Sequence, residues 1–411
     1  MSFPRRRSQL ALVCALVLAA CADPTGSSGA EGRLPRPLTD AEKAVVGASN
    51  QFAFALLGRV NAEHPGDNLF ISPLSVSMAL GMTMNGTAGA TMSEMRGMLG
   101  FGSLPLEDVN ASYRSLIELL RGLDGRVDFR IANAIWYDDA FPVEEPFVNI
   151  TRTFFDARVD ARPFTDPATV QTINDWVRTA TAGKIEEILD AIPPDAVMYL
   201  LNAIYFKGDW TTQFDPELTA PQPFAGHNGP TTVPLMHVTD SVRYAEIDGT
   251  QLIELPYGGG AFAMSVVLPP SGEDIEAFLA EFTTARWNAL HGAAARTPVM
   301  IWLPKFTLEQ DYTLNDALQA LGMRLAFDGG DFTPMSGAHG RELAVSKVKH
   351  KTFVDVHEEG TEAAAVTSVE IIRVCACGPL YPAFRADRPF LFAIRERASG
   401  TILFVGKVGA L

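Results

Sequence analysis

Few residues in this chain have the types and spacing that catalysis requires. Ser346 and Lys349 fit the Ser-x-x-Lys spacing that some penicillin-binding enzymes use for acyl transfer. The motif is short enough to arise by chance, and it falls in an alternating, strand-like stretch, whereas the chemistry requires it at the start of a helix. The seven histidines include no pair at i and i+4, so His350 and His357 fit structural roles better than metal ligation. We therefore expect no metal site and no cofactor.

Two thiols, those of Cys375 and Cys377, stand on either side of one alanine. They could be two unpaired thiols, or a redox switch in which oxidation within or between molecules changes the local geometry. A ring closed within Cys-x-Cys is tight and strained. Metal binding by two thiols alone is the weaker interpretation.

The segment that contains these thiols, from Glu358 to Leu380, has two structural interpretations. From Thr361 its residues alternate between a small or apolar set and a set that carries both acids, Glu362 and Glu370, as in a half-buried strand. A glycine before it and a Gly-Pro pair after it mark a flexible stretch. Thr361 followed by glutamate and alanines also fits a capped helix start, and those residues alone favour the helix. The β-branched residues of 369–372 favour the strand.

Composition and charge exclude some classes of protein. The chain has 411 residues, of which 47% are hydrophobic and 20% charged, which is typical of a globular protein with a large core. Its net charge of −15 argues against a nucleic-acid partner, which needs a basic face. We expect a monomer.

The first residues have the pattern of an export signal. Arg5–Arg7 precede an apolar run over 10–17, which is too short to span a membrane. Leu18-Ala19-Ala20-Cys21 then resembles the lipobox of bacterial lipoproteins, which implies a signal peptide over 1–20 and a lipid on Cys21. The residue after Cys21 resembles an outer-membrane sorting pattern, so we expect an exported outer-membrane lipoprotein that touches the membrane through this lipid only. An ordinary signal cut after Ala22, giving a secreted protein, is the alternative.

The rest of the chain is expected to form one domain over 41–411, after a flexible tether of small and polar residues over 21–40. Helical patterns come first: 44–57, then a helix capped by Ser72 with Pro73 as its first residue, then 170–179 with a continuation over 184–189. Strand patterns follow, at 197–206, 261–269, 298–306, 344–356, 389–396 and 401–408. Helices followed by many strands predict a mixed α+β fold with large, mainly antiparallel sheets.

Seven stretches, taken in order, resemble the serpin family from about residue 45 to the C-terminus. They are NLFISPLSVSMALGMTMNGTAGATMSEM, NAIYFKGDWTTQFD, ELPYGGGAFAMSVVLP, LPKFTLEQDYTLNDALQALGM, DFTPMSG, LAVSKVKHKTFVDVHEEGTEAAAVTS and FRADRPFLFAIRERASGTILFVGKV. Each is modest evidence alone, but their common order is very specific.

The resemblance implies three β-sheets, about nine helices and an exposed reactive loop, and it resolves Glu358–Leu380 in favour of the strand. In this family a protease cleaves the loop, the loop inserts into the main sheet as a new strand, and the acyl-enzyme is trapped. The resemblance therefore implies an inhibitor and not an enzyme. Apart from its glutamates, the hinge of the loop has neither proline nor bulky charged residues, which favours an inhibitor of serine-type, or alternatively cysteine-type, endopeptidases.

The resemblance also assigns site residues by motif. The hinge would consist of Glu358, Gly360, Thr361, Glu362, Ala363, Ala364 and Ala365. The residues that control opening under the middle of the main sheet would be Ser72, Pro73, Ser75, Asn202 and His350. Trp210 and Lys305 would lie with Glu358 at the top of this sheet, where a Lys305–Glu358 pair is expected.

The scissile bond has two assignments. The family's hinge-to-bond spacing, counted from Glu358, gives Val374-Cys375, whereas counting back from Phe384 gives a position about two residues later, because this loop is longer than usual. Arg373-Val374 is the alternative. Val374 favours an elastase- or subtilisin-like target, and Arg373 a trypsin-like one. Two other classes of function stay open: a binding protein that uses the fold without trapping, and an exported enzyme that uses Ser346 and Lys349.

Overall fold

The computed structural model of the protein describes residues 34–361 and 381–411. The expected signal peptide, Cys21 and the tether up to residue 33 lie outside the described residues. So do Glu362, Ala363, Ala364 and Ala365 of the expected hinge and both candidate scissile bonds, Arg373-Val374 and Val374-Cys375. The first helix begins at Asp40, close to the expected start of the domain.

Ten α-helices and three short 3₁₀ turns lie in the described part of the chain. The helices are α1 (Asp40–Glu63), α2 (Pro73–Met84), α3 (Gly89–Met98), α4 (Leu106–Gly122), α5 (Glu145–Phe155), α6 (Ala168–Ala180), α7 (Ile275–Glu281), α8 (Thr284–Ala293), α9 (Asn315–Ala320) and α10 (Thr333–Ser336), and the turns are η1 (Pro216–Leu218), η2 (Leu325–Phe327) and η3 (Gly337–His339). Helix α2 begins as predicted, because Ser72 Oγ accepts a hydrogen bond from the Ser75 amide at 3.3 Å and Pro73 occupies the first turn.

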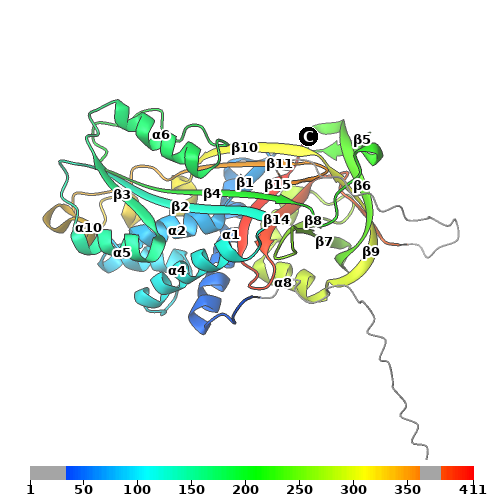
Figure 1. Ribbon diagram of the computed structural model, residues 1–411, viewed down its shortest axis with the longest axis horizontal. Coiled ribbons are helices and arrows are strands. Elements are labelled where there is room, and N and C mark those ends of the chain that lie inside the picture. Colours follow the sequence, from blue (N-terminus) through cyan, green and yellow to red (C-terminus); the bar gives the residue numbers. More distant parts are fainter. Residues whose placement is uncertain (1–33, 362–380) are drawn as a thin grey trace, which may run out of the picture.

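The main sheet has six strands, in the order β10 (Phe306–Thr313), β11 (Lys349–Val356), β12 (Gly360–Thr361), β4 (Met198–Asp209), β2 (Val127–Asp138) and β3 (Ala157–Arg162). All neighbours are antiparallel except β2 and β3. Helix α6 covers one face of β2 and β4, and α2, α4 and α5 lie under the opposite face (Figure 1).

The second sheet has nine strands. Its path is β1 (Leu69–Ile71), β15 (Ile402–Val408), β14 (Phe390–Glu396), β8 (Phe262–Leu268), β7 (Thr250–Tyr257), β6 (Gly229–Ile247), β9 (Ala295–Pro304) and β13 (Ala383–Arg385), and β5 (Ala220–Gly226) pairs with β6 off this path. The mixed α+β architecture expected from the sequence is confirmed. The described residues form two hydrogen-bonded sheets, where three were expected, because the 19-residue strand β6 pairs with β5, β7 and β9 and so joins the two smaller sheets.

Two local predictions were wrong. The strand expected from residue 344 begins only at Lys349, because the preceding segment packs across other elements: the Val345 amide donates to Ala326 O at 2.7 Å, and the Leu314 amide donates to Val348 O at 2.9 Å. Helix α6 does not continue over 184–189. Ala182 and Gly183 take positive φ angles of 53° and 85°, which end the helix, and the chain turns back so that the 184–189 segment packs beside α6.

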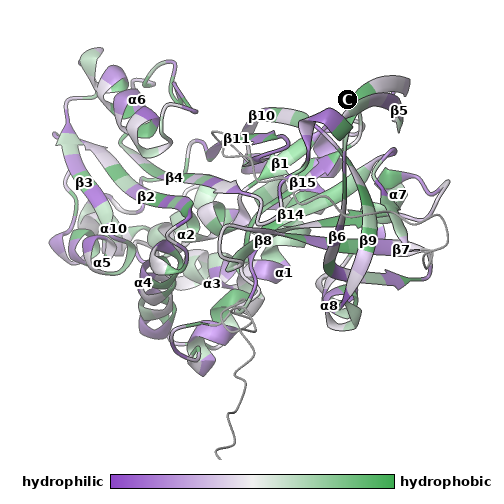
Figure 2. Ribbon diagram, turned by 45° about the vertical axis from the view of Figure 1, so that its right-hand side comes forward, coloured by the Kyte–Doolittle hydropathy of each residue, from purple (hydrophilic) through white to green (hydrophobic). Residues whose placement is uncertain are grey.

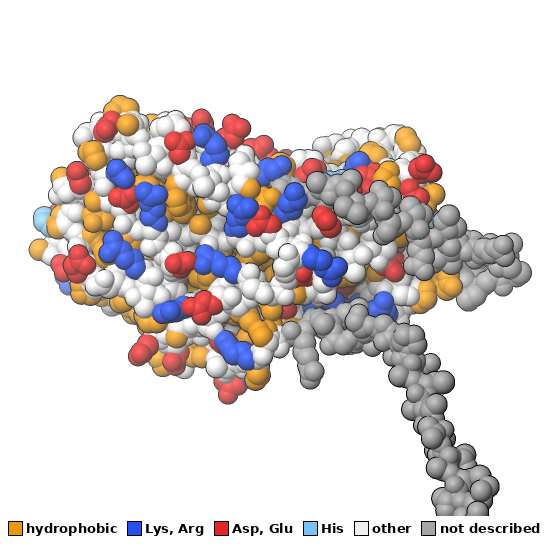
Figure 3. All heavy atoms as spheres, in the orientation of Figure 1, with side chains coloured by type: hydrophobic (Ala, Val, Ile, Leu, Met, Phe, Trp, Pro, Cys, Tyr) orange, Lys and Arg blue, Asp and Glu red, His pale blue; other side chains and the backbone are white. Residues whose placement is uncertain are grey.

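The core is divided by the main sheet. A large cluster fills the space between the two sheets and around α1 and α2, and a smaller one lies under α6, where Trp136 and Ile173 are fully buried. In Figure 2 the hydrophobic colour concentrates on the strands β8, β14 and β15 at the centre, and hydrophilic residues mark the outer helices. On the face seen in Figure 3, basic and acidic side chains are interspersed.

Candidate functional site: the opening of the main sheet

The two-residue strand β12 lies between β4 and β11 at one end of the main sheet. Thr361 pairs with Gly208 of β4 on one side and with Val356 of β11 on the other, and Gly360 pairs with Asp209. A tight turn leads into it, in which the His357 amide donates to Gly360 O at 3.0 Å and the Gly360 amide donates to His357 O at 3.2 Å. Because β12 is antiparallel to both neighbours, β4 and β11 run parallel to each other.

Gly360 is required at this position for steric reasons. A Cβ atom built on it would lie 2.3 Å from Gly208 O and 2.6 Å from Asp209 Cα, which are backbone atoms that cannot swing away. A side chain here would therefore push the turn away from β4.

Aromatic packing holds the turn from beneath. Trp210 stacks on Tyr257 with ring centroids 4.5 Å apart, and its indole Nε1 donates to His357 O at 2.9 Å. The Trp210 amide donates to Glu359 O at 2.8 Å. Tyr257 Oη and Thr361 Oγ1 lie 2.6 Å apart, so the first side chain of β12 is bonded directly to the floor of the opening.

The expected Lys305–Glu358 pair is present beside this turn. Lys305 Nζ lies 2.7 Å from Glu358 Oε2, and Thr219 Oγ1 donates to Oε1 at 2.9 Å. Burial by itself would raise the pKa of Glu358, but the hydrogen bonds from Lys305 and Thr219 outweigh it and lower the pKa. The carboxylate therefore stays charged and links the turn to Lys305, between β9 and β10, and to Thr219, just before β5.

Under the middle of the sheet, Ser72 and His350 are joined. The Ser72 amide donates to His350 Nε2 at 2.9 Å, and Ser72 Oγ donates to Leu403 O at 2.7 Å. These two bonds tie the start of α2 to β11 of the main sheet and to β15 of the second sheet. Burial disfavours the imidazolium and lowers the pKa of His350 to about 4.

Asn202, expected in the same cluster, has a different partner. Its Nδ2 donates to Asn133 Oδ1 at 2.5 Å, and Asn133 Nδ2 donates to Phe155 O at 2.6 Å. Within the described parts of the chain, Asn202 Oδ1 is buried without a hydrogen-bond partner. Sequence reasoning missed Asn133, although Asn-Ala-Ile occurs both at 133–135 and at 202–204, and the two asparagines that begin these triplets pair across β2 and β4.

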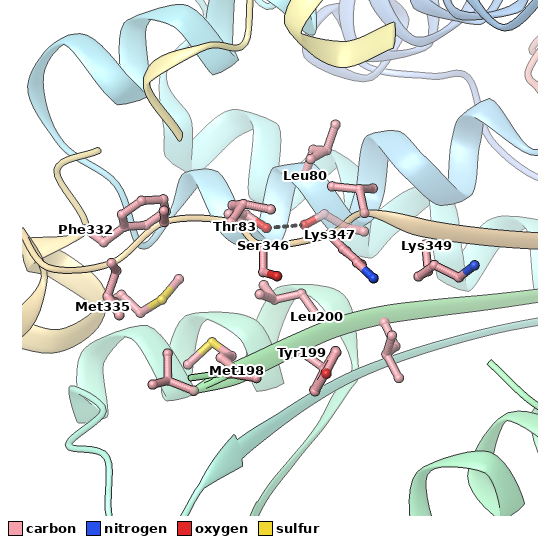
Figure 4. Close-up of a pocket in the computed structure, with 18 of the residues that line it drawn as sticks. Leu80, Thr83, Met198, Tyr199, Leu200, Phe332, Met335, Ser346, Lys347 and Lys349 are labelled. Carbon is pink, nitrogen blue, oxygen red and sulfur yellow. Dashed lines mark hydrogen bonds between the residues drawn. The ribbon is translucent and has the colours of Figure 1, made fainter. Parts of the chain in front are cut away.

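A pocket lies lower in the sheet, between α2, β4 and the segment before β11 (Figure 4). Its cavity volume is about 110 Å³. Its lining is mostly apolar, with Leu80, Met198, Leu200, Phe332 and Met335 among the residues around it. Residues 198–201 of β4 form one wall of the pocket. Among the described strands, they pair with β2 on one edge, and their other edge has no partner strand. The pocket is therefore suited to an extended, largely apolar chain segment.

The Ser-x-x-Lys motif forms one edge of this pocket. Ser346 lies in the irregular segment before β11, where its carbonyl accepts a hydrogen bond from Asn315 Nδ2 at 2.8 Å. Lys349 pairs with Asp311. Neither residue lies at the start of a helix, which is where the acyl-transfer motif requires them. In 34–361 and 381–411, no group of three His, Cys, Asp or Glu side chains is placed to hold a metal ion, and no helix is long and apolar enough to cross a membrane.

The fold and this opening define a mixed α+β protein with a short strand wedged between two parallel strands of its main sheet. The sequence model for serpins (serine protease inhibitors) matches residues 47–410, and the chain belongs to the serpin family. It is 36% identical over 376 residues to an uncharacterized serpin-like protein of Thermococcus kodakarensis, which covers 89% of this chain and 86% of that protein.

Two solved structures are similar over most of the chain. The thermophilic serpin tengpin in its native state has a TM-score of 0.81 and 30% identity, with 92% of this chain and 96% of tengpin covered. Human thyroxine-binding globulin, solved as a complex with thyroxine, has a TM-score of 0.81 and 28% identity, with 90% and 99% covered.

Proposed function

We propose that this serpin inhibits endopeptidases, serine-type in the first place, by trapping them as a suicide substrate. The protease would cleave the segment after Thr361 and form an acyl-enzyme. The N-terminal part of the cleaved segment would then extend β12 between β4 and β11 and carry the acylated protease with it, which distorts the protease before water completes hydrolysis. No catalytic group of this chain is needed.

The observation that carries this proposal is the pairing of β12 with both neighbours. An antiparallel ladder, continued in the observed register, fixes the partner of every later residue. Thr367 would lie between Asn202 of β4 and His350 of β11. The registers with β4 and with β11 therefore agree on the position of Thr367. Its hydroxyl would donate a hydrogen bond to Asn202 Oδ1, which has no partner among the described residues.

Further along the same register, Glu370 would lie beside Tyr199 of β4, and beside Lys347 once the segment before β11 straightens and extends that strand. Val369 and Ile371 would point to the opposite face of the strand from Glu370. They would lie next to Leu200 and Met198, which line the apolar pocket. The pocket thus matches the apolar residues of the segment in position and in chemistry. The acids would stay on the solvent face.

The remaining parts of the proposal rest on the sequence alone. We keep Val374-Cys375 as the cleaved bond and an elastase- or subtilisin-like protease as the target, with Arg373-Val374 and a trypsin-like protease as the alternative. We also propose that the protein is an exported monomer with a lipid on Cys21.

A binding protein without trapping is the second candidate. It is supported by the similarity to thyroxine-binding globulin and by the pocket, which an apolar ligand could fill. A loop that is cleaved but does not insert would favour it.

The test mixes the protein lacking residues 1–21 with elastase, subtilisin, trypsin and chymotrypsin. Denaturing gels and mass spectrometry then look for a covalent adduct, and the mass of the released C-terminal peptide names the cleaved bond. Trapping predicts an adduct and a large rise in melting temperature on cleavage. Cleavage without an adduct and without that rise would overturn trapping.

A further inference from the structure

A row of side chains crosses four segments on the outer face of the second sheet. Arg385 of β13 pairs in register with Trp302 of β9, and Trp302 pairs with His237 of β6. The rings of Trp302 and His237 stack with centroids 4.3 Å apart, and the Arg385 guanidinium lies 5.3 Å from the centroid of the Trp302 ring. On the far side of β6, the η1 turn contacts this strand and carries Leu218.

Hydrogen bonds fix the orientation of this row. His237 Nδ1 is bonded to Ile301 O at 2.9 Å, and Arg385 Nε donates to Asp387 Oδ2 at 2.9 Å. The side chains are therefore held before any partner arrives, which reduces the entropy lost on binding. His237, Trp302 and Arg385 are partly buried, and each keeps part of its surface exposed.

Two exposed apolar side chains flank the row. The large hydrophobic side chains that are exposed in the described chain are Leu218 at 52%, Tyr381 at 40% and Leu325 at 36%. Leu218 lies at the β6 end of the row, and Tyr381 lies two residues before the start of β13 at the other end. Packing between neighbouring strands is enough to explain why the rings of Trp302 and His237 stack. The stability of the sheet does not, however, require Leu218 and Tyr381 to be exposed. Exposed apolar groups around a Trp and an Arg have the composition of a binding surface.

The place of these side chains in the fold indicates which kind of protein would bind them. Pro382 O accepts a hydrogen bond from the Met300 amide at 3.0 Å, so the chain is anchored to β9 within two residues of the end of the segment 362–380. A protease that acts on that segment would therefore come close to β9, with which β13 pairs. The strand β5, which follows the η1 turn directly, lies on the same side of the molecule as β9 (Figure 1).

We propose that Leu218, His237, Trp302, Tyr381 and Arg385 form a docking surface for the target protease, beside its active-site cleft. The proposal rests on the proposed function. The surface fits an apolar patch flanked by carboxylates or carbonyl oxygens, because it offers aromatic faces, a guanidinium and two apolar side chains. It is small, so it adds to the contact through the cleaved segment and affects how fast the protease engages it.

The test compares four single variants with the parent protein: Trp302→Ala, Arg385→Gln, Leu218→Ala and, as the matched control, Leu325→Ala. Leu325 is similarly exposed but lies on η2, which contacts α3. The second-order rate constant for cleavage of the segment 362–380 by the protease is measured at low and high salt. The fraction of cleaved protein that remains covalently bound to the protease is measured in the same samples. Leu218→Ala keeps the test valid if Trp302→Ala fails to fold, because Leu218 is half-exposed.

We expect Trp302→Ala to lower the rate roughly tenfold and Leu218→Ala a few-fold, while Leu325→Ala leaves it unchanged. Arg385→Gln should also reduce the salt dependence of the rate. The share that ends as adduct should not change. Parent-like rates for Leu218→Ala and a folded Trp302→Ala would overturn the docking surface and leave trapping intact. Cleavage without adduct would overturn trapping, yet the rates would still test the surface. No cleavage by any protease would overturn both.

Discussion

His350 Nε2 accepts the hydrogen bond of the Ser72 amide at 2.9 Å, so the imidazole must be unprotonated at this nitrogen. This single bond joins the main sheet to the first turn of α2. Protonation would convert the acceptor into a donor that faces another donor.

A pH dependence of stability follows from this bond. Burial lowers the pKa of His350 from its ordinary 6.5 to about 4, so the unfolded state binds more protons than the folded state between these pH values. The free energy of unfolding should therefore fall as pH decreases from 6.5 to 4, by up to about 3 kcal/mol from His350. Urea unfolding across this range checks it. His291, whose pKa burial also lowers to about 4, contributes in the same direction. His350→Gln should reduce the slope with pH. An unchanged slope in that variant would contradict the role of His350.

Gly360 should control whether cleavage leads to trapping. Gly360→Ala places a methyl group against Gly208 O and Asp209 Cα, so β12 should separate from β4. We expect cleavage at the parental rate but with most of the protein released as cleaved product and little as adduct, measured on denaturing gels. Gly125→Ala is the matched control, since nothing lies within 4 Å of that position. A parental adduct yield for Gly360→Ala would show that β12 does not lead insertion.

The Lys305–Glu358 pair should couple the turn to β9. Lys305 is 39% exposed and the Glu358 side chain 10%, so the pair lies between an exposed and a buried ion pair. A double-mutant cycle with Lys305→Met and Glu358→Gln should give a coupling free energy of about 1 kcal/mol in chemical unfolding. Thr219→Val removes the other bond to Glu358 and serves as the comparison. Purely additive effects would mean that the pair does not hold the turn.

The register of the inserted strand can be tested by cross-linking. In a background where Cys375 and Cys377 are alanine, Lys347→Cys and Glu370→Cys should form a disulfide after cleavage and not before. Once insertion extends β11 to residue 347, the continued register places the two residues opposite each other. Opposed residues of neighbouring strands have Cα atoms ~4.5–5.5 Å apart, which a disulfide tolerates. Lys347→Cys with Val369→Cys is the control, since residue 369 faces the other side. Mass spectrometry distinguishes the two. Cross-linking of the control pair instead would indicate a register shifted by one residue.

The sequence predicted those parts of the site that depend on residues close together in the chain, and it predicted fewer of the contacts between distant residues. The Ser72 cap and Pro73 at the start of α2 were predicted because both signals are local, within one turn of helix. The pairing of Lys305 with Glu358 was expected only through the family motifs. The two residues are 53 positions apart in the sequence, and no local pattern predicts that they meet. The continuation of α6 was wrong because apolar spacing alone could not reveal the turn at Ala182 and Gly183.

Other parts depended on contacts between distant segments. Asn133 was missed because its role exists only once β2 and β4 pair in register. The joining of the two smaller sheets was missed because it depends on which strands meet along the 19 residues of β6, and not on the alternation within β6. The docking surface proposed above is of the same kind, since Arg385, Trp302 and His237 are far apart in sequence.

The closed turn at 357–360 has a kinetic consequence. Forming a new strand is slow mainly in its first step, when a turn must close and fix backbone dihedrals before any ladder bond compensates for the lost entropy. Here that nucleus already exists in the intact chain, so insertion would consist of propagation from it. Its rate would be limited by the separation of β4 and β11, and not by a search for partners. Since doubling the length of a loop raises the free energy of closing it by only about 0.6 kcal/mol, the roughly two residues by which this segment exceeds the usual length in the family should slow capture very little.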